Sequence, residues 1–115
     1  MMPTYNPGTI VLVNFPFTDL QTSKVRPALV LTSKGDDVII LGIFSKVPDE
    51  FHDSWIKIDK TDQGFHLTGL KKTSVVKTEK IAVIQKSLIR KQLGSLPLAL
   101  MQEVKAVLLK TLEIG

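Results

Sequence analysis

The chain consists largely of short apolar runs that are rich in valine and isoleucine and are separated by turn-forming residues. Runs of this length and composition predict β-strands, because β-branched side chains suit the pleated surface of a sheet. The segments with this character are residues 9–13, 28–32, 38–44, 55–58 and 74–85. They predict a sheet that takes up most of the chain.

The run 38–44 is apolar throughout apart from one glycine and lies between two polar turns, so we expect a central strand that is buried on both faces. The segment 74–85 contains two β-branched stretches around Thr78, Glu79 and Lys80, and it forms either one bent strand or two short strands. Residues 60–72 carry turn signals and are expected to contain loops.

The pattern changes after Gly94, where Ser95 is suited to cap a helix and Pro97 is suited to its first turn. The apolar residues that follow at helical spacing are Leu100, Met101, Val104, Val107, Leu108 and Leu112. We therefore expect an amphipathic C-terminal helix that covers the sheet. The expected fold class is mainly β (α+β): a small, mostly antiparallel sheet that curls into an SH3-like partial barrel and is closed by this helix.

Length and composition limit the classes of protein that are compatible with this chain. With 115 residues, 43% of them hydrophobic, it is expected to form a single domain over residues 1–115. The chain has no cysteine, which excludes disulfides, thiolate catalysis and cysteine zinc sites and favours a cytoplasmic location. The longest apolar run, 38–44, is too short to cross a bilayer, so no membrane partner is expected.

The net charge of +4 favours an anionic partner, either a nucleic acid or an acidic protein segment. The basic residues that crowd the later part of the chain are Lys71, Lys72, Lys77, Lys80, Lys86, Arg90 and Lys91. Charge alone is weak support for nucleic-acid binding, because many basic proteins use such residues only to keep their surface solvated.

The polar loop between the first two expected strands ends in Arg26 and Pro27. Proline biases the preceding residue towards an extended conformation, so Arg26 is expected to be held by the strand that it begins. A cation fixed in this way suits an anionic ligand. Its simpler interpretation is a surface residue that pairs with a loop carboxylate such as Asp19.

Other chemically capable residues also have simple structural interpretations. Ser45 ends the central strand, where a hydroxyl commonly bonds to its own turn, and Lys77 and Glu79 suit an ordinary exposed pair. His52 and His66 lie in polar sequence with no third ligand at a recognisable spacing, so we expect surface residues and no metal site. The motifs of nucleotide-binding loops, serine hydrolases and zinc proteases are absent from the sequence.

Taken together, these segments resemble one known family. The stretches GTIVLVNFPFTD, KVRPALVL, IFSK and TSVVKTEKIAVI, followed by the closing helix, resemble the MazF/PemK/Kid family of toxin endoribonucleases over about residues 8–112. The resemblance implies a compact barrel-like fold, a homodimer, and cleavage of single-stranded RNA, in particular mRNA, at short sequences without a metal ion or other cofactor. It also implies a cognate antitoxin whose flexible tail occupies the RNA groove.

The resemblance assigns candidate catalytic residues. Arg26 matches the catalytic arginine of the family and Ser45 its catalytic serine or threonine hydroxyl. Lys77 and Glu79, which follow a pair of valines, stand where one branch of the family has an arginine and an aspartate. In such a site the RNA 2′-OH attacks phosphorus to give a 2′,3′-cyclic phosphate and a 5′-OH, and Glu79, or less favourably Asp19, is the candidate to take the proton.

The first loop is the candidate for reading the RNA sequence, since unpaired bases are read by stacking and by edge hydrogen bonds. Phe17 is suited to stack on a base. The polar residues suited to base edges are Thr18, Asp19, Gln21 and Ser23, and those suited to phosphates are Lys24 and Lys46. The alternative function is a non-catalytic RNA- or protein-binding module of the same fold.

Overall fold

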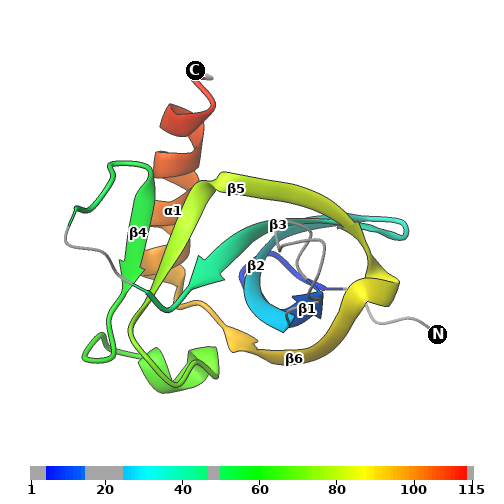
Figure 1. The fold of residues 1–115 in the computed structure, drawn as a ribbon, viewed down its shortest axis with the longest axis horizontal. Helices are drawn as coiled ribbons and strands as arrows, with labels where there is room; N and C mark the ends of the chain where they lie inside the picture. Colours follow the sequence, from blue (N-terminus) through cyan, green and yellow to red (C-terminus); the bar gives the residue numbers. More distant parts are fainter. Residues whose placement is uncertain (1–4, 15–24, 47–49, 114–115) are drawn as a thin grey trace.

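The computed structural model describes residues 5–14, 25–46 and 50–113, which form a six-stranded antiparallel sheet and one α-helix (Figure 1). The elements are β1 (Thr9–Asn14), β2 (Val25–Lys34), β3 (Asp37–Phe44), β4 (Trp55–Ile58), the 3₁₀ turn η1 (Phe65–Thr68), β5 (Ser74–Gln85), the 3₁₀ turn η2 (Lys86–Leu88), β6 (Ile89–Ser95) and α1 (Leu98–Thr111). The strand order is β4-β5-β3-β2-β1-β6, and the edge strands β4 and β6 are not paired with each other. Since β5 and β6 arch around β1, β2 and β3, the sheet is strongly curled, and the expected mainly β class is confirmed.

The central position of β3 agrees with its sequence. It pairs with β2 on one side and with β5 on the other. Val38, Ile40, Leu41 and Ile43 are all fully or almost fully buried. A continuous apolar run is stable here because both faces of the strand are covered.

The β5 segment is a single bent strand, which settles the choice left open by the sequence. Leu41 of β3 pairs with Ile81, but the next residue, Gly42, pairs with Lys77, so the three residues between them form a bulge in β5. Bulges bend the strand that carries them. Thr78 anchors the bend: its amide and its hydroxyl both donate to the carbonyl of Ser54, at 3.1 and 2.6 Å.

The strand β6 was not expected from the sequence. Its residues Arg90, Lys91 and Gln92 are exposed, so the segment has none of the apolar alternation that marks the other strands. It forms an edge of the sheet by pairing with β1, with register shifts at two places. Polar side chains are ordinary on an edge strand because they discourage pairing with another chain.

The helix α1 begins at Leu98 and is preceded by Pro97 as its N-cap residue, without a side-chain cap. The expectation that Ser95 caps the helix is wrong, because Ser95 is the last residue of β6 and pairs with Thr9. Leu112 lies just after the helix and is exposed, so its place on the apolar face is also wrong. The rest of that face packs as expected, with Met101 buried in the core.

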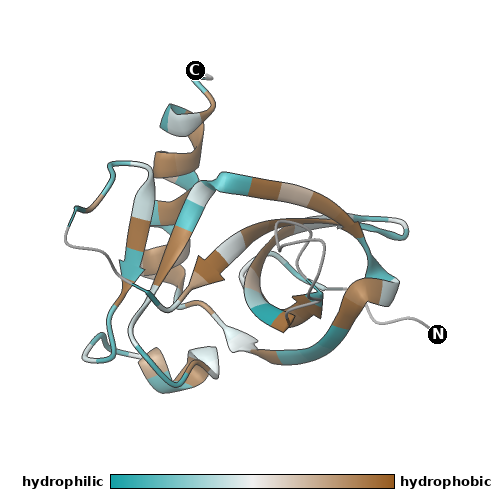
Figure 2. Cartoon of the chain, in the orientation of Figure 1, coloured by the Kyte–Doolittle hydropathy of each residue, from teal (hydrophilic) through white to brown (hydrophobic). Residues whose placement is uncertain are grey.

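The buried residues form two clusters because side chains alternate along the strands. Ile10 and Leu29 belong to the cluster that packs against α1, whereas Val11 and Ala28 belong to a second cluster. Figure 2 shows apolar residues along the strands and α1, and hydrophilic residues at the connecting turns. Within the described part of the chain, no helix is long and apolar enough to cross a membrane.

Candidate active site

Arg26 and Ser45 are brought together by two adjacent strands. Arg26 is the second residue of β2, and Ser45 directly follows the last residue of β3, Phe44. Ala28 pairs with Gly42, and continuing this antiparallel register places Arg26 opposite Phe44. The guanidinium carbon of Arg26 lies 5.5 Å from the centroid of the Phe44 ring, so the neighbouring strand supports the cation.

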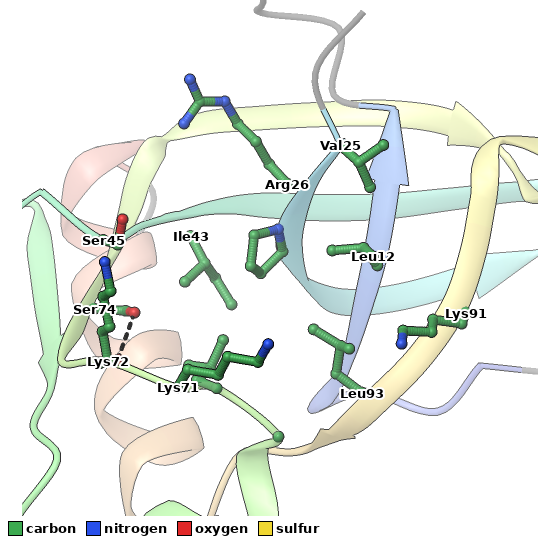
Figure 3. A pocket seen from close by; sticks show the side chains of 13 residues that line it. Leu12, Val25, Arg26, Ile43, Ser45, Lys71, Lys72, Ser74, Lys91 and Leu93 are labelled. Atoms are coloured by element: carbon green, nitrogen blue, oxygen red, sulfur yellow. Dashed lines mark hydrogen bonds between the residues drawn. The ribbon is translucent and has the colours of Figure 1, made fainter.

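Two pockets adjoin these residues, and Arg26 and Ser45 line both of them. The first has a volume of about 400 Å³ and is drawn in Figure 3. Apolar side chains, Leu12 and Ile43 among them, lie between Arg26 at one end and lysines at the other. The lysines that line this pocket are Lys71, Lys72 and Lys91.

The second pocket has a volume of about 540 Å³ and is the more polar of the two. Besides Arg26 and Ser45, it is lined by Lys46 and Lys77. Three cations and a hydroxyl therefore face one space, an arrangement suited to a phosphate group. Lys46, which the sequence singled out as a phosphate contact, is exposed at this place.

A row of alternating cations and aromatic rings crosses the sheet at this pocket. Arg26 comes from β2, Phe44 from β3, Lys77 from β5 and Trp55 from β4, which is the order of these strands in the sheet. The ammonium nitrogen of Lys77 lies 4.6 Å from the centroid of the Phe44 ring and 4.4 Å from that of Trp55. Lys77 thus lies within cation–π distance of two rings.

Glu79 lies beside Trp55, the last residue of this row, and accepts a hydrogen bond at each of its two carboxylate oxygens. The Ser54 hydroxyl donates to Oε1 at 3.0 Å, and the Trp55 indole nitrogen donates to Oε2 at 2.8 Å. Burial raises the pKa of Glu79, but the bonds from Trp55, its own amide and Ser54, together with the charge of Lys77, lower the pKa below its usual value. The carboxylate is therefore stabilised in its ionised form.

The remaining residues expected from the sequence fall into two groups. Phe17, Thr18, Asp19, Gln21, Ser23 and Lys24 lie outside the described residues. His52 and His66 are exposed, as expected of surface histidines, and the His52 ring lies 4.4 Å from that of Trp55. In the part of the chain that the structure describes, no group of three or more histidine and acidic side chains is placed to hold a metal ion.

The sequence did not identify Ser54 and Trp55 as residues of the site. Trp55 was expected only as a strand residue, and nothing in its own segment indicates that β4 pairs it with Lys77. Lys71, Lys72 and Lys91 were noted only for their charge. Their place beside Arg26 depends on the loop after η1 and on β6, and β6 was not expected.

The described residues form a small curled sheet with a C-terminal helix, and an arginine, a serine and several lysines surround two adjoining pockets. These features define a class of β-rich domains with a cationic site. Comparison with known proteins makes the class specific. The family of PemK-like, MazF-like toxins of type II toxin-antitoxin systems matches residues 6–112, so the chain belongs to this family. No curated protein sequence matches the chain.

Solved structures of similar fold include MazF from Deinococcus radiodurans, with a TM-score of 0.75 and 19% identity over 98% of this chain and 100% of the other. The Mycobacterium tuberculosis toxin MazF-mt6 has a TM-score of 0.71 and 18% identity over 96% and 99%. An endoribonuclease in complex with its cognate antitoxin, from a mycobacterial species, has a TM-score of 0.73 and 16% identity over 99% and 98%. At these identities the likeness shows the fold.

Proposed function

We propose that this chain is the toxin of a type II toxin-antitoxin system and acts as a sequence-specific endoribonuclease on single-stranded RNA, in particular mRNA. The observation that carries the proposal is the position of Arg26 and Ser45, which line both pockets of a cationic site in a chain of the toxin family. One structure of similar fold is an endoribonuclease bound to its antitoxin, which agrees with this activity.

The proposed reaction is attack by the RNA 2′-OH on the adjacent phosphorus. A bond forms between the 2′ oxygen and phosphorus as the 2′ proton leaves, and the bond from phosphorus to the 5′ oxygen breaks as that oxygen gains a proton. The products are a 2′,3′-cyclic phosphate and a 5′-OH. Negative charge builds up on the phosphoryl oxygens, so the main demand on the protein is positive charge held in place.

Arg26 is suited to this demand because its planar guanidinium can donate two parallel hydrogen bonds to the phosphoryl oxygens. A fixed donor of this kind is worth on the order of 3 to 4 kcal/mol of the barrier. The Ser45 hydroxyl would hold a phosphoryl oxygen, and Lys77 would supply a further cation. With these cations, cleavage is proposed to need no metal ion, as the family resemblance implies.

The lysines of the first pocket extend the site beyond the reacting phosphate. Lys71, Lys72 and Lys91 are exposed, and we assign them to RNA phosphates on one side of the cut. Lys46 would contact a phosphate at the second pocket. Base recognition is assigned to the first loop, as the sequence predicts.

The proposed partners, besides RNA, are a cognate antitoxin and a second copy of the chain. The basic pockets suit an acidic antitoxin tail that competes with RNA. The homodimer follows from the family resemblance. Sedimentation of the purified chain tests it: a monomer alone at micromolar concentration would rule the dimer out.

Cleavage of a long single-stranded RNA in EDTA tests the function. We compare the wild-type chain with Arg26→Ala and with Arg90→Ala, a matched control on the exposed face of β6 that lines neither pocket. Wild type and Arg90→Ala should cut at the same discrete positions, and Arg26→Ala should be slower by about 10²- to 10³-fold. Intact RNA with all three proteins, or equal cutting by Arg26→Ala, would favour the non-catalytic binding module.

A further inference from the structure

Two neighbouring side chains donate hydrogen bonds to Glu79, which favours its ionised form over its protonated form. Each of its carboxylate oxygens already accepts a hydrogen bond, one from Ser54 and one from Trp55. The indole of Trp55 can only donate, so it requires an acceptor at this position.

Trp55 links Glu79 to the second pocket, because its ring contacts Lys77, which lines that pocket. Trp55 is 8% exposed, and the centroid of its ring lies 4.4 Å from the Lys77 ammonium nitrogen. Phe44 contacts the same ammonium from β3 at 4.6 Å. Lysine has four rotatable side-chain bonds, so without these rings its ammonium would sample many positions.

We infer that Glu79 is a positioning residue. It fixes the indole of Trp55, which together with Phe44 holds Lys77 at the second pocket, beside Arg26 and Ser45. The inference rests on the proposed function and refines it. Lys77 is the group that touches the RNA phosphate, and Glu79 positions it by holding the Trp55 ring in place. This assignment differs from the expectation that Glu79 itself takes the 2′ proton.

The substitution Glu79→Gln separates the two roles. The amide oxygen of glutamine accepts from Trp55, and the amide nitrogen donates to the Ser54 hydroxyl, which can accept as well as donate. The geometry is kept while the charge and the basicity are lost. Glu79→Ala removes both bonds, and Trp55→Phe keeps a ring beside Lys77 but removes the N–H that Glu79 holds.

If Glu79 is a positioning residue, Glu79→Gln should cleave RNA within about threefold of wild type, whereas Glu79→Ala and Trp55→Phe should each lose roughly tenfold or more. Adding Glu79→Ala to Lys77→Ala should cost nothing further, because both changes disable the same group. The pH dependence of kcat should keep its shape in Glu79→Gln. Melting temperatures verify that each variant is folded.

A proton acceptor gives the opposite pattern. Glu79→Gln would then fall as far as Glu79→Ala, by about 10²- to 10⁴-fold, and the acid limb of the pH profile would disappear. That result would overturn the inference and leave the proposed function standing. If Glu79→Ala does not fold, Glu79→Gln and Trp55→Phe still decide between the two roles.

The affinity for a nucleic acid that cannot be cleaved tests the inference independently of cleavage. The probe is a fluorescein-labelled single-stranded 2′-deoxy oligonucleotide of mixed sequence, which lacks the attacking hydroxyl. Glu79→Ala and Lys77→Ala should weaken its binding by the same factor, and Glu79→Gln should not. Equal affinity for wild type, Glu79→Ala and Lys77→Ala would refute the positioning role, whereas a wild-type chain that binds but never cleaves RNA would refute only the proposed function.

Discussion

The substitution Gly94→Ala should destabilise the protein strongly, because β6 and the η1 turn touch at this glycine without room for a side chain. A Cβ atom at Gly94 would lie 2.1 Å from the carbonyl oxygen of Leu67 and 2.6 Å from the carbonyl carbon of Thr68. Both are backbone atoms, which cannot rotate away as a side chain does. The two segments would have to separate.

The size of the effect follows from the overlap. A Cβ atom is essentially never found within 3.0 Å of such an atom, so the backbones must part by at least 0.9 Å, the difference between 3.0 and 2.1 Å. Overpacking of this severity costs roughly 3 kcal/mol. For a domain of this size, that lowers the melting temperature by roughly 12 °C.

The assay is thermal unfolding of the purified chain, followed by circular dichroism and by the fluorescence of Trp55, its single tryptophan. Gly35→Ala is the control: Gly35 has a φ of 59°, but nothing lies within 4 Å of its added Cβ, so only the backbone cost of about 1 kcal/mol applies. The steric reasoning is refuted if Gly94→Ala melts at or above the temperature of Gly35→Ala. In that case β6 and η1 do not pack as described.

Two further predictions concern charge. Lys72→Ala should weaken RNA binding and make the slope of log affinity against log salt shallower by about 0.7, the value for one phosphate contact on a single strand. Lys105→Ala, on the exposed face of α1, is the control and should leave the slope unchanged. If neither variant changes the slope, Lys72 does not contact the RNA. The lowered pKa of Glu79 means that its stabilising contribution is present above its unfolded pKa and is lost as the pH falls through its folded pKa. Acid unfolding of Glu79→Gln should therefore show a smaller loss of stability over that range than wild type, and identical acid profiles would contradict the pKa shift.

Strands whose residues alternate or are apolar throughout could be predicted from the sequence. The run 38–44 became β3, and the alternating run 55–58 became β4 with the expected bounds. The hydrophobic pattern of one segment predicts which of its side chains are buried, and this prediction does not require knowing which strands pair. The bend in β5 was one of two open choices, because a bulge depends on the register with β3.

The strand β6 and the start of α1 could not be predicted, and the reason is physical. Arg90, Lys91 and Gln92 are exposed, and the segment is a strand only because β1 offers it a partner. That pairing also takes Ser95 out of its expected role as a helix cap. Tertiary pairing overrides local preference in both cases.

Some residues of the site could be predicted from the sequence, whereas the contacts between them could not. Arg26 and Ser45 could be singled out because each stands at the end of an apolar strand and matches a family motif. The contacts of Lys77 with Phe44 and Trp55 join residues from three strands, and only the register of the sheet reveals them. The environment of Glu79 depends on Ser54 and Trp55, so its sequence position gave its charge but not its hydrogen-bond partners.

The most direct test of cleavage by 2′-OH attack at the pocket of Arg26 and Ser45 uses a short RNA that contains one mapped cut site. The same RNA is also made with a 2′-deoxy nucleotide immediately 5′ of the cut, and both are incubated with the chain in EDTA. We expect the unmodified RNA to give a 2′,3′-cyclic phosphate on one fragment and a 5′-OH on the other, and the modified RNA to stay intact. Cleavage of the modified RNA, or fragments that carry a 5′-phosphate, would contradict this mechanism.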